Sequence, residues 1–455
     1  MSSNVQKKSI DMTQGPMLGN IIRFVIPLML GSMLQLLYNA ADLIVVGRFA
    51  GSTATAAVGA TGSINTLFVN ICIGLSVGAS VIVSRRIGSK DPEGVHRSVH
   101  TAMGLGILSG IIGMILGIVL AKPLLELFGT PKDVLPGATL YMKIFFIGLP
   151  GSMVYNFGAA ILRAAGDSKR PLYILAASGL VNVALNLVLV IVFGMGVEGV
   201  AIATAVANYV SAIAVVMFLG RTSESYKLNI KKIKFYKEEL IESLKIGIPA
   251  SIQSSTFSIS NSIIQGAINS FGSEAMAGSA AASSIEGFVY TGMNAFYHAA
   301  MTCIGQNYGA KNEKRIYKTI WICIASVIIA GLTLGIISVV FARPLLGIYI
   351  TDSEAAMEFG RTKMIYLGLP YFMCGIMEIL AGALRGIGHS NMGMVNSIVG
   401  ACGLRVLWVQ FILPLSHTPE NLFLCWPISW VVVIIAHTVC FLAVRKHSMY
   451  VMRNQ

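Results

Sequence analysis

Twelve long apolar runs constrain this chain more than any other feature of its sequence. A helix needs about 20 apolar residues to cross the ~30 Å hydrocarbon layer of a bilayer. A helix also satisfies its own backbone amide and carbonyl groups where no water is present. The sequence therefore predicts an all-α membrane protein with twelve transmembrane helices. The predicted spans are residues 21–46, 58–83, 98–120, 138–160, 172–194, 197–219, 246–270, 275–303, 317–341, 362–383, 393–415 and 422–444.

The composition excludes an ordinary soluble protein. Apolar residues make up 55% of the chain and charged residues 12%, whereas soluble domains carry about 25% charged residues. So few charges cannot cover a water-facing surface. The formal net charge of +13 sits on short loops between apolar runs, which indicates membrane topology and no nucleic-acid partner.

The distribution of basic residues predicts the orientation. The side that holds both termini carries 25 Lys and Arg residues, and the opposite side carries 7, among them Lys363. Basic loops stay in the cytoplasm. We therefore expect a multi-pass protein of a bacterial cytoplasmic (inner) membrane with both termini in the cytoplasm. The first apolar run is too long for a cleaved signal peptide and is expected to act as an uncleaved anchor.

An internal repeat divides the chain into two halves. The segment around Pro27 parallels the segment around Pro249, and ILRAAGDS at residue 161 parallels ALRGIGHS at 383, both with an offset of 222. Each half contains six predicted spans, an even number, so both have the same orientation. Such parallel repeats are related by a pseudo-twofold axis along the membrane normal. We expect two six-helix bundles with a cleft between them, which favours a transporter that works by alternating access.

The predicted domain boundaries follow from the repeat and the polar segments. A basic, partly amphipathic stretch between the halves is expected to lie on the cytoplasmic surface as a linker. The boundaries are a cytoplasmic N-terminal segment at 1–20, an N-terminal lobe at 21–219, the linker at 220–245, a C-terminal lobe at 246–444 and a cytoplasmic tail at 445–455.

Charged residues within the spans are the first candidates for function, because a charge in hydrocarbon costs about 2.5–3.5 kcal/mol on insertion. Asp42 lies in the outer half of the first span. A desolvated carboxylate binds a proton more readily than an exposed one, and with neutral oxygens around it the same group can hold Na⁺. The alternative is an interfacial ion pair with Arg48.

Two amides and a hydroxyl are predicted to accompany Asp42. Asn182 and Asn186 are spaced i, i+4, so they share one face of the fifth span. They are candidates either for hydrogen bonds between helices or, with Thr204 of the sixth span, for ligands of the coupling cation. A Na⁺ site would comprise Asp42, Asn182 and Thr204. The choice between H⁺ and Na⁺ stays open.

Further polar residues in the spans are candidates for a substrate cavity. Glu378 aligns with Asn156 through the repeat. Glu286 and Arg405 either line the cleft or pair within the lobe, and Arg405 is expected to stack on Trp408. Arg163 and Arg385 are predicted to be structural cations at helix ends. The cavity candidates are Gln35, Asn39, Asn156, Gln253, Asn261, Glu286, Glu378 and Arg405.

Soluble-protein motifs carry little weight here. Gly194-x-Gly196-x-x-Gly199 fits a dinucleotide pattern, but it lies between two spans and predicts a tight turn. The sequence has no H-E-x-x-H motif and no phosphate-binding G-x-x-x-x-G-K-[ST] loop. The seven cysteines have no C-x-x-C spacing. The chain is therefore not expected to be an enzyme or to need a cofactor.

The chain resembles the multidrug and toxic compound extrusion (MATE) family over nearly its whole length. The resemblance is carried by IPLMLGSMLQLLYNAADLIVVGRFAG, LRAAGDS, LRGIGHS, NVALNLVLVIVFGMGVEGVAIAT and GQNYGAKNEKRI. The first span is most similar to the bacterial branch with DinF and MepA-type exporters. The family exchanges organic cations and other amphipathic compounds for H⁺ or Na⁺.

The resemblance assigns residues to a cation site in the amino-terminal lobe. Asp42, Asn182 and Thr204 match family positions of the same residue types, and Asn186 stands where the family commonly has a second aspartate. The acidic pair of another branch is poorly matched in the C-terminal lobe, where Gln253 is the nearest analogue in the seventh predicted span, 246–270.

The resemblance implies an antiporter for a small organic compound, functional as a monomer in the lipid bilayer. The nearest alternative is a flippase for lipid-linked precursors, which often has a cationic cavity. A membrane-embedded enzyme would need clustered catalytic side chains at one depth, and a channel would conduct without counter-substrate. The sequence does not identify the substrate.

Overall fold

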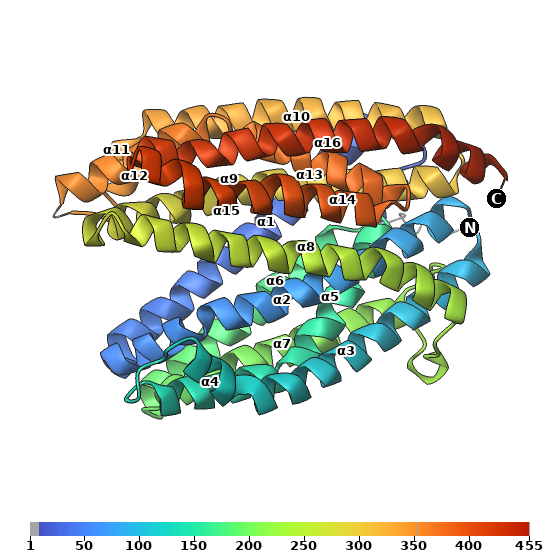
Figure 1. Cartoon of the computed structure of the whole chain (residues 1–455). Coiled ribbons are helices and arrows are strands. Elements are labelled where there is room, and N and C mark those ends of the chain that lie inside the picture. Colours follow the sequence, from blue (N-terminus) through green and yellow to red (C-terminus); the bar gives the residue numbers. More distant parts are fainter. Residues whose placement is uncertain (1–8, 352, 455) are drawn as a thin grey trace. The chain divides into compact units, whose positions relative to one another are not determined.

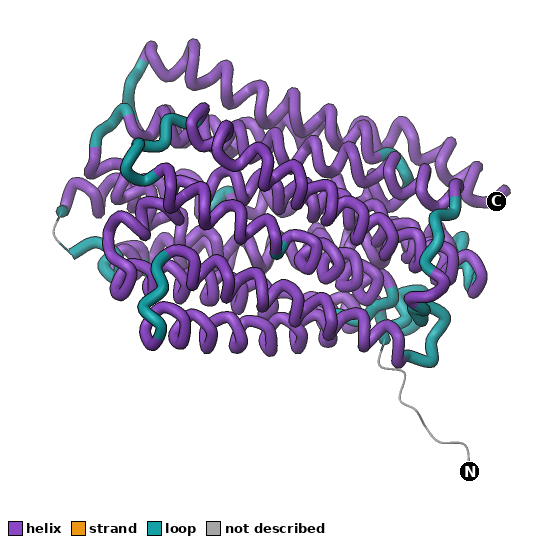
Figure 2. The backbone as a smooth tube through the Cα atoms, turned by 90° about the horizontal axis from the view of Figure 1, so that it is seen from below, coloured by secondary structure: helices purple, strands orange, loops and turns teal. Residues whose placement is uncertain are grey.

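The computed structural model describes residues 9–351 and 353–454, and within them every regular element is a helix (Figure 1, Figure 2). The apolar runs explain this, since each is long enough to bond its backbone along its own axis. The helices of the first half are α1 (Met17–Val45), α2 (Gly51–Gly88), α3 (Pro92–Leu127), α4 (Leu135–Ile147), α5 (Leu149–Ala164), α6 (Lys169–Asn186) and α7 (Val197–Arg221). Those of the second half are α8 (Lys237–Asn269), α9 (Ser273–Gly309), α10 (Glu313–Val340), α11 (Ala342–Leu346), α12 (Glu354–Gly368), α13 (Tyr371–Gly386), α14 (Ser390–Ser397), α15 (Leu404–Leu407) and α16 (Pro419–Asn454).

Short π-helical and 3₁₀ turns extend several of these helices. The π turns widen the backbone where α1, α6, α14 and α15 continue. They are Val46–Ala50 (η1), Leu187–Val192 (η2), Ile398–Gly403 (η4) and Trp408–Ile412 (η5), and the 3₁₀ turns are Ile230–Lys232 (η3) and Leu413–Leu415 (η6).

The predicted all-α membrane fold is confirmed. Among the described residues, eight helices are long and apolar enough to cross a membrane, and ten spans result when each of two bent pairs counts as one. The bent pairs are α4 with α5, at 43°, and α12 with α13, at 45°. The other two predicted spans lie in α8 and α9, which have 33 and 37 residues and are rich in Ser, Asn and Gln.

The helices are longer than the predicted spans. α2 has 38 residues and ends beyond Arg85 and Arg86. α9 and α16 have 37 and 36 residues. An apolar run marks only the part of a helix suited to hydrocarbon, while backbone hydrogen bonding carries the helix on through polar residues.

The two halves pack in the same way, each within itself. In the first half α5 is central and packs against α2, α3 and α7. In the second half α13, the counterpart of α5 in the repeat, packs against α9, α10 and α16. The internal repeat read from the sequence is therefore a repeat of structure as well.

The chain divides into two compact units whose boundaries fall inside α1 and α8. Unit 1 contains residues 26–251 with 9–11, and unit 2 contains Met12–Val25 with the described residues from Ile252 onward. In unit 2 the Thr319 hydroxyl donates to the Met17 sulfur over 3.4 Å. In unit 1 the Ser251 hydroxyl donates to the Ile71 carbonyl over 2.8 Å. The lobe boundaries 21–219 and 246–444 stay a prediction drawn from the repeat.

The segment between α7 and α8 is held on unit 1 by backbone hydrogen bonds. The amide of Asn229 donates to His100 Nε2 over 3.1 Å, and the amide of Tyr236 donates to Thr101 Oγ1 over 3.1 Å. The buried carboxylate of Glu239 then pairs with Arg97 at 3.1 Å. The predicted linker 220–245 is thus the end of α7, an ordered irregular stretch and the first turns of α8.

The predicted tight turn at the glycine motif is confirmed. Residues 193–196 connect η2 to α7 without helix. Gly194 has a φ of +66°, a left-handed conformation that costs glycine little.

Candidate functional site

Four side chains from three helices of unit 1 form one hydrogen-bonded cluster. Asn186 Nδ2 donates to Asp42 Oδ1 over 2.5 Å and lies 3.3 Å from Asn182 Oδ1. Asn182 Nδ2 donates to Thr204 Oγ1 over 3.4 Å, and that hydroxyl donates to the Val200 carbonyl over 3.0 Å. The structure therefore brings together all four residues predicted for cation coupling, and we call this set the Asp42 cluster.

The local sequence explains how the cluster is positioned. The i, i+4 spacing puts Asn182 and Asn186 on one face of α6, and Asn186 is the last residue of α6 before the π turn η2. Gly179 lies one turn before Asn182. It allows the ring of Tyr38 on α1 to come so close that a Cβ at residue 179 would lie 1.9 Å from the ring. The Tyr38 hydroxyl donates to the Ala176 carbonyl over 3.3 Å. α1 and α6 are thereby held together beside Asp42.

The cluster is buried on its α6 side. Asn186 is 1% and Asn182 6% exposed, while Asp42 is half-buried. The Asn186 Oδ1 atom is buried and has no hydrogen-bond partner. A buried acceptor without a partner is costly, so this oxygen is free to serve an incoming cation or water.

The alternative ion pair of Asp42 with Arg48 is not found. Among the described residues, no Lys, Arg or His lies within 4.0 Å of the Asp42 carboxylate. Arg48 is exposed in η1. Asp42 has amide and hydroxyl neighbours instead of a fixed counter-charge. A carboxylate, amide oxygens and a hydroxyl are the donor set that suits a proton or a hard cation.

The remaining candidates of unit 1 lie apart from the Asp42 cluster. Gln35 and Asn39 are exposed on α1. The amide of Asn156 donates to the Ser152 carbonyl of its own helix over 2.8 Å. None of the three hydrogen-bonds to the cluster, so their predicted place in a substrate cavity stays a prediction.

In unit 2, Gln253 and Arg385 form a second buried polar group. Gln253 Oε1 accepts from an Arg385 guanidinium nitrogen over 2.6 Å, and another nitrogen donates to the Tyr297 hydroxyl over 2.5 Å. Gln253 Nε2 donates to Ser397 Oγ over 3.0 Å. Arg385 lies in the last turn of α13 as predicted, but its side chain is buried. It is therefore an internal connector between α8, α9 and α13.

Arg405 stacks on a tryptophan, but not on Trp408, so the predicted partner was wrong. The Arg405 guanidinium lies over the ring of Trp426, 5.5 Å from its centre, and Nε donates to Ser429 Oγ over 3.0 Å. Trp408 donates to the Asn421 carbonyl instead. Both partners of Arg405 come from α16, and the π turn that begins at Trp408 changes the face on which this residue lies.

Glu286 pairs within unit 2 with Lys363, one of the seven basic residues on the side predicted to lie opposite the termini. Lys363 Nζ lies 3.4 Å from Glu286 Oε2, and the two side chains are 5% and 13% exposed. Lys363 is a buried residue of α12, in keeping with its place in the first turn of the predicted span 362–383.

The last two candidates form no hydrogen bond or close ion pair in the described part of the chain. Glu378 is half-buried on α13 and makes no hydrogen bond or ion pair there. Asn261 is exposed on α8. The described residues also contain no group of three His, Cys, Asp or Glu side chains that could hold a metal ion.

Comparison with known proteins identifies the family. The MatE family model matches residues 27–188 and 249–409. The two ranges begin 222 residues apart, the offset of the internal repeat. Each half of the chain therefore carries one copy of the family's pattern.

Individual relatives match nearly the whole chain. It is 28% identical over 398 residues to the probable multidrug resistance protein YpnP of Bacillus subtilis (strain 168), covering 88% of this chain and 89% of YpnP. It is 22% identical over 426 residues to the multidrug export protein MepA of Staphylococcus saprophyticus, covering 93% and 91%. The crystal structure of MATE in complex with MaL6 has the same fold, with a TM-score of 0.86 at 22% identity over 100% of both chains. Because the family model matches both halves, the chain belongs to the MatE family, the multidrug and toxic compound extrusion transporters.

Proposed function

We propose that this protein is a secondary active antiporter that exports organic compounds, cationic or amphipathic, in exchange for H⁺ or Na⁺. The observation that carries the proposal is the Asp42 cluster. It joins one carboxylate, without an ion-pair partner, to the amides of Asn186 and Asn182 and to Thr204. Membership of the family supports the proposal of export. The names of the multidrug resistance protein YpnP and the multidrug export protein MepA support drug-like substrates.

In this mechanism cation binding changes the contacts of Asp42. A proton on the carboxylate, or Na⁺ beside it, weakens the hydrogen bond that Asn186 now donates. The contact between α1 and α6 then changes, and so does the balance between outward-open and inward-open states. Because the cation and the substrate draw on one conformational equilibrium, each changes the affinity for the other. No organic cofactor takes part, and one chain suffices.

The proposed setting is the cytoplasmic membrane of a bacterium, with both termini on the cytoplasmic side. The bias of 25 to 7 basic residues supports this orientation. In this orientation the cation gradient across the cytoplasmic membrane would drive efflux.

The test is dye efflux from proteoliposomes, driven separately by a pH gradient and by a Na⁺ gradient. We expect one of the gradients to drive wild-type efflux and Asp42→Asn to lose at least about 90% of the driven rate, since the amide binds neither ion as a carboxylate does. The matched control is Asp133→Asn, which removes an exposed carboxylate between α3 and α4.

Each outcome decides between the alternatives. Efflux driven by pH alone makes Asp42 a proton carrier, and efflux driven by Na⁺ makes it a cation ligand. Wild-type rates for Asp42→Asn would refute the assigned role. If neither gradient moves dye through the wild type, the multidrug function fails, and flipping of labelled lipid-linked precursors is measured next.

A further inference from the structure

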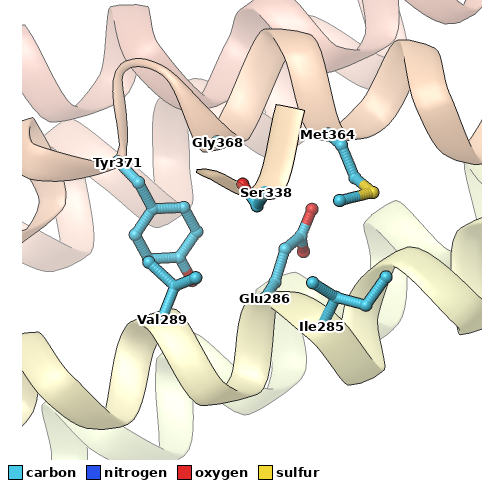
Figure 3. A pocket seen from close by; sticks show the side chains of 7 residues that line it. All are labelled: Ile285, Glu286, Val289, Ser338, Met364, Gly368 and Tyr371. Atoms are coloured by element: carbon cyan, nitrogen blue, oxygen red, sulfur yellow. The ribbon is translucent and has the colours of Figure 1, made fainter. Parts of the chain in front are cut away.

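A small cavity lies inside unit 2, whereas the Asp42 cluster belongs to unit 1. Side chains of α9, α10, α12 and α13 surround it (Figure 3). It has room for about one water molecule. The lining residues are Ile285, Glu286, Val289, Ser338, Met364, Gly368 and Tyr371. Three of these carry polar side-chain groups, namely Glu286, Ser338 and Tyr371.

The two carboxyl oxygens of Glu286 differ in their polar partners. One oxygen, Oε2, faces the ammonium of Lys363 at 3.4 Å. The other, Oε1, is buried and has no hydrogen-bond partner. A buried carboxylate oxygen without a donor is costly, and Glu286 lines the cavity that could hold the missing donor.

Lys363 is satisfied without Glu286. Its ammonium donates to Ser283 Oγ over 2.6 Å, to Ser279 Oγ over 3.2 Å and to the Ser279 carbonyl over 3.3 Å. Three oxygens match the three donors of a lysine. If the Glu286 carboxylate loses its charge, Lys363 can therefore remain protonated in place.

The cavity also adjoins a bend in the backbone. Gly368 is the last residue of α12 and Tyr371 the first of α13, and these two helices form a bent pair at 45°. The Ser338 hydroxyl donates to the Gly335 carbonyl of its own helix over 2.8 Å. The Ser338 oxygen can therefore still accept a hydrogen bond. The titratable groups that face Glu286 are Lys363 from α12 and Tyr371 from α13, and the cavity-lining residue of α10 is a serine.

We propose that Glu286 is a second proton-binding site, with Lys363 as its built-in counter-charge and the cavity as the place of the water that delivers the proton. A proton from the aqueous phase is relayed through this water, which accepts one proton as it donates another to Oε1, so that the water stays neutral and the ion pair becomes a neutral acid beside an ammonium. The attraction between α9 and α12 then weakens next to the bend. The proposed proton-binding site is argued from the geometry of unit 2 alone. A role for this proton in the transport cycle rests on the proposed function.

The test follows protonated carboxyl groups by infrared difference spectroscopy of the full chain, reconstituted in lipid, between acid and alkaline pH. A protonated carboxyl has a carbonyl stretch that disappears when the group ionises. We expect Glu286→Gln to remove one titrating component of this band. Asp42→Asn serves as the comparison for the other cluster. Glu358→Gln is the matched control, because its side chain is 52% exposed.

Lys363→Gln keeps the test decisive if Glu286→Gln does not fold. Loss of a neighbouring cation favours the protonated acid, so we expect the Glu286 component to move to higher pH with unchanged amplitude. A component present only in Lys363→Gln would show that Glu286 is permanently ionised in the wild type. Equal bands in wild type and Glu286→Gln would overturn the proposal in the same way.

The failure of this proposal is distinguishable from failure of the proposed function. If Asp42→Asn stops gradient-driven efflux while Glu286→Gln leaves the band unchanged, the transport function stands and the second site falls. If the wild type transports nothing under either gradient but Glu286→Gln removes a component, the second site stands alone.

Discussion

At the scale of single residues, Asn186 connects the carboxylate of the Asp42 cluster to its other amide. Its side-chain nitrogen Nδ2 donates a hydrogen bond to Asp42 Oδ1 and lies 3.3 Å from Asn182 Oδ1. Its side-chain oxygen Oδ1 is buried and has no hydrogen-bond partner. An aspartate at this position would accept where the asparagine donates. The cluster would then contain two carboxylates at hydrogen-bonding distance, which repel each other unless a cation lies between them.

We therefore predict that Asn186→Asp increases the dependence of transport on Na⁺. A second negative charge near the cation is worth about 4 kcal/mol at 4 Å with an effective dielectric constant near 20. We expect the Na⁺ concentration for half-maximal efflux to fall about tenfold or more. The measurement is dye efflux against Na⁺ concentration at fixed pH.

The control for this prediction is Asn156→Asp, which changes an amide that bonds only within its own helix α5. The same tenfold change in this control would mean that added charge alone, and not its place in the Asp42 cluster, controls the response. No change in Asn186→Asp would contradict the view that the cluster binds the coupling cation.

At the scale of helices, α1 and α6 meet one turn before Asp42, where the Tyr38 hydroxyl donates to the Ala176 carbonyl. The two helices come close at Gly179, where an added Cβ would lie 1.9 Å from the Tyr38 ring. The Tyr38 ring must then turn away, which breaks its hydrogen bond to the Ala176 carbonyl. Asp42 follows Tyr38 by one turn, so its position relative to Asn186 changes with it.

We predict that Gly179→Ala lowers gradient-driven efflux at least about fivefold and destabilises the protein by about 1–3 kcal/mol, the usual cost of overpacking. Efflux and thermal unfolding in detergent are the two measurements. Gly62→Ala on α2 is the control, because a Cβ there meets nothing within 4 Å. Wild-type efflux by Gly179→Ala would show that α1 and α6 need not stay this close.

At the scale of the whole molecule, α1 and α8 each belong to both compact units. The residues before Ile26 pack with unit 2, and those of α8 up to Ser251 pack with unit 1. Both changes of unit occur within two residues of a proline, Pro27 or Pro249. A proline removes a backbone hydrogen bond from the helix interior, so α1 and α8 each lack one such bond close to the change of unit.

The orientation of the whole chain is predicted by its charge bias. We expect a membrane-impermeant maleimide to label Lys132→Cys in intact cells and Lys234→Cys only after permeabilisation, since both positions are exposed and lie in loops at opposite ends of the predicted spans. The native cysteines are buried except for the intermediate Cys440, so the wild type gives the background. Labelling of Lys234→Cys in intact cells would reverse the predicted orientation.

The sequence by itself determined the all-helical class, the order of the helices and the repeat. The reason is physical, because hydrocarbon requires long apolar runs that bond their own backbone, and such runs are visible in any sequence. It also marked Asp42, since a lone carboxylate in an apolar run is conspicuous. The i, i+4 spacing placed Asn182 and Asn186 together, but joining them to Asp42, 144 residues away, came from the family resemblance.

Only the tertiary structure decided which buried charges meet. Arg385 joins Gln253 across 132 residues, Arg405 stacks on Trp426 and not on Trp408, and Lys363, at the start of a predicted span, pairs with Glu286. Helical periodicity fixes neighbours within one helix, whereas these partners lie on different helices whose mutual rotation depends on packing. The sequence therefore shows that a charge is buried, and the packing of the helices decides what neutralises it.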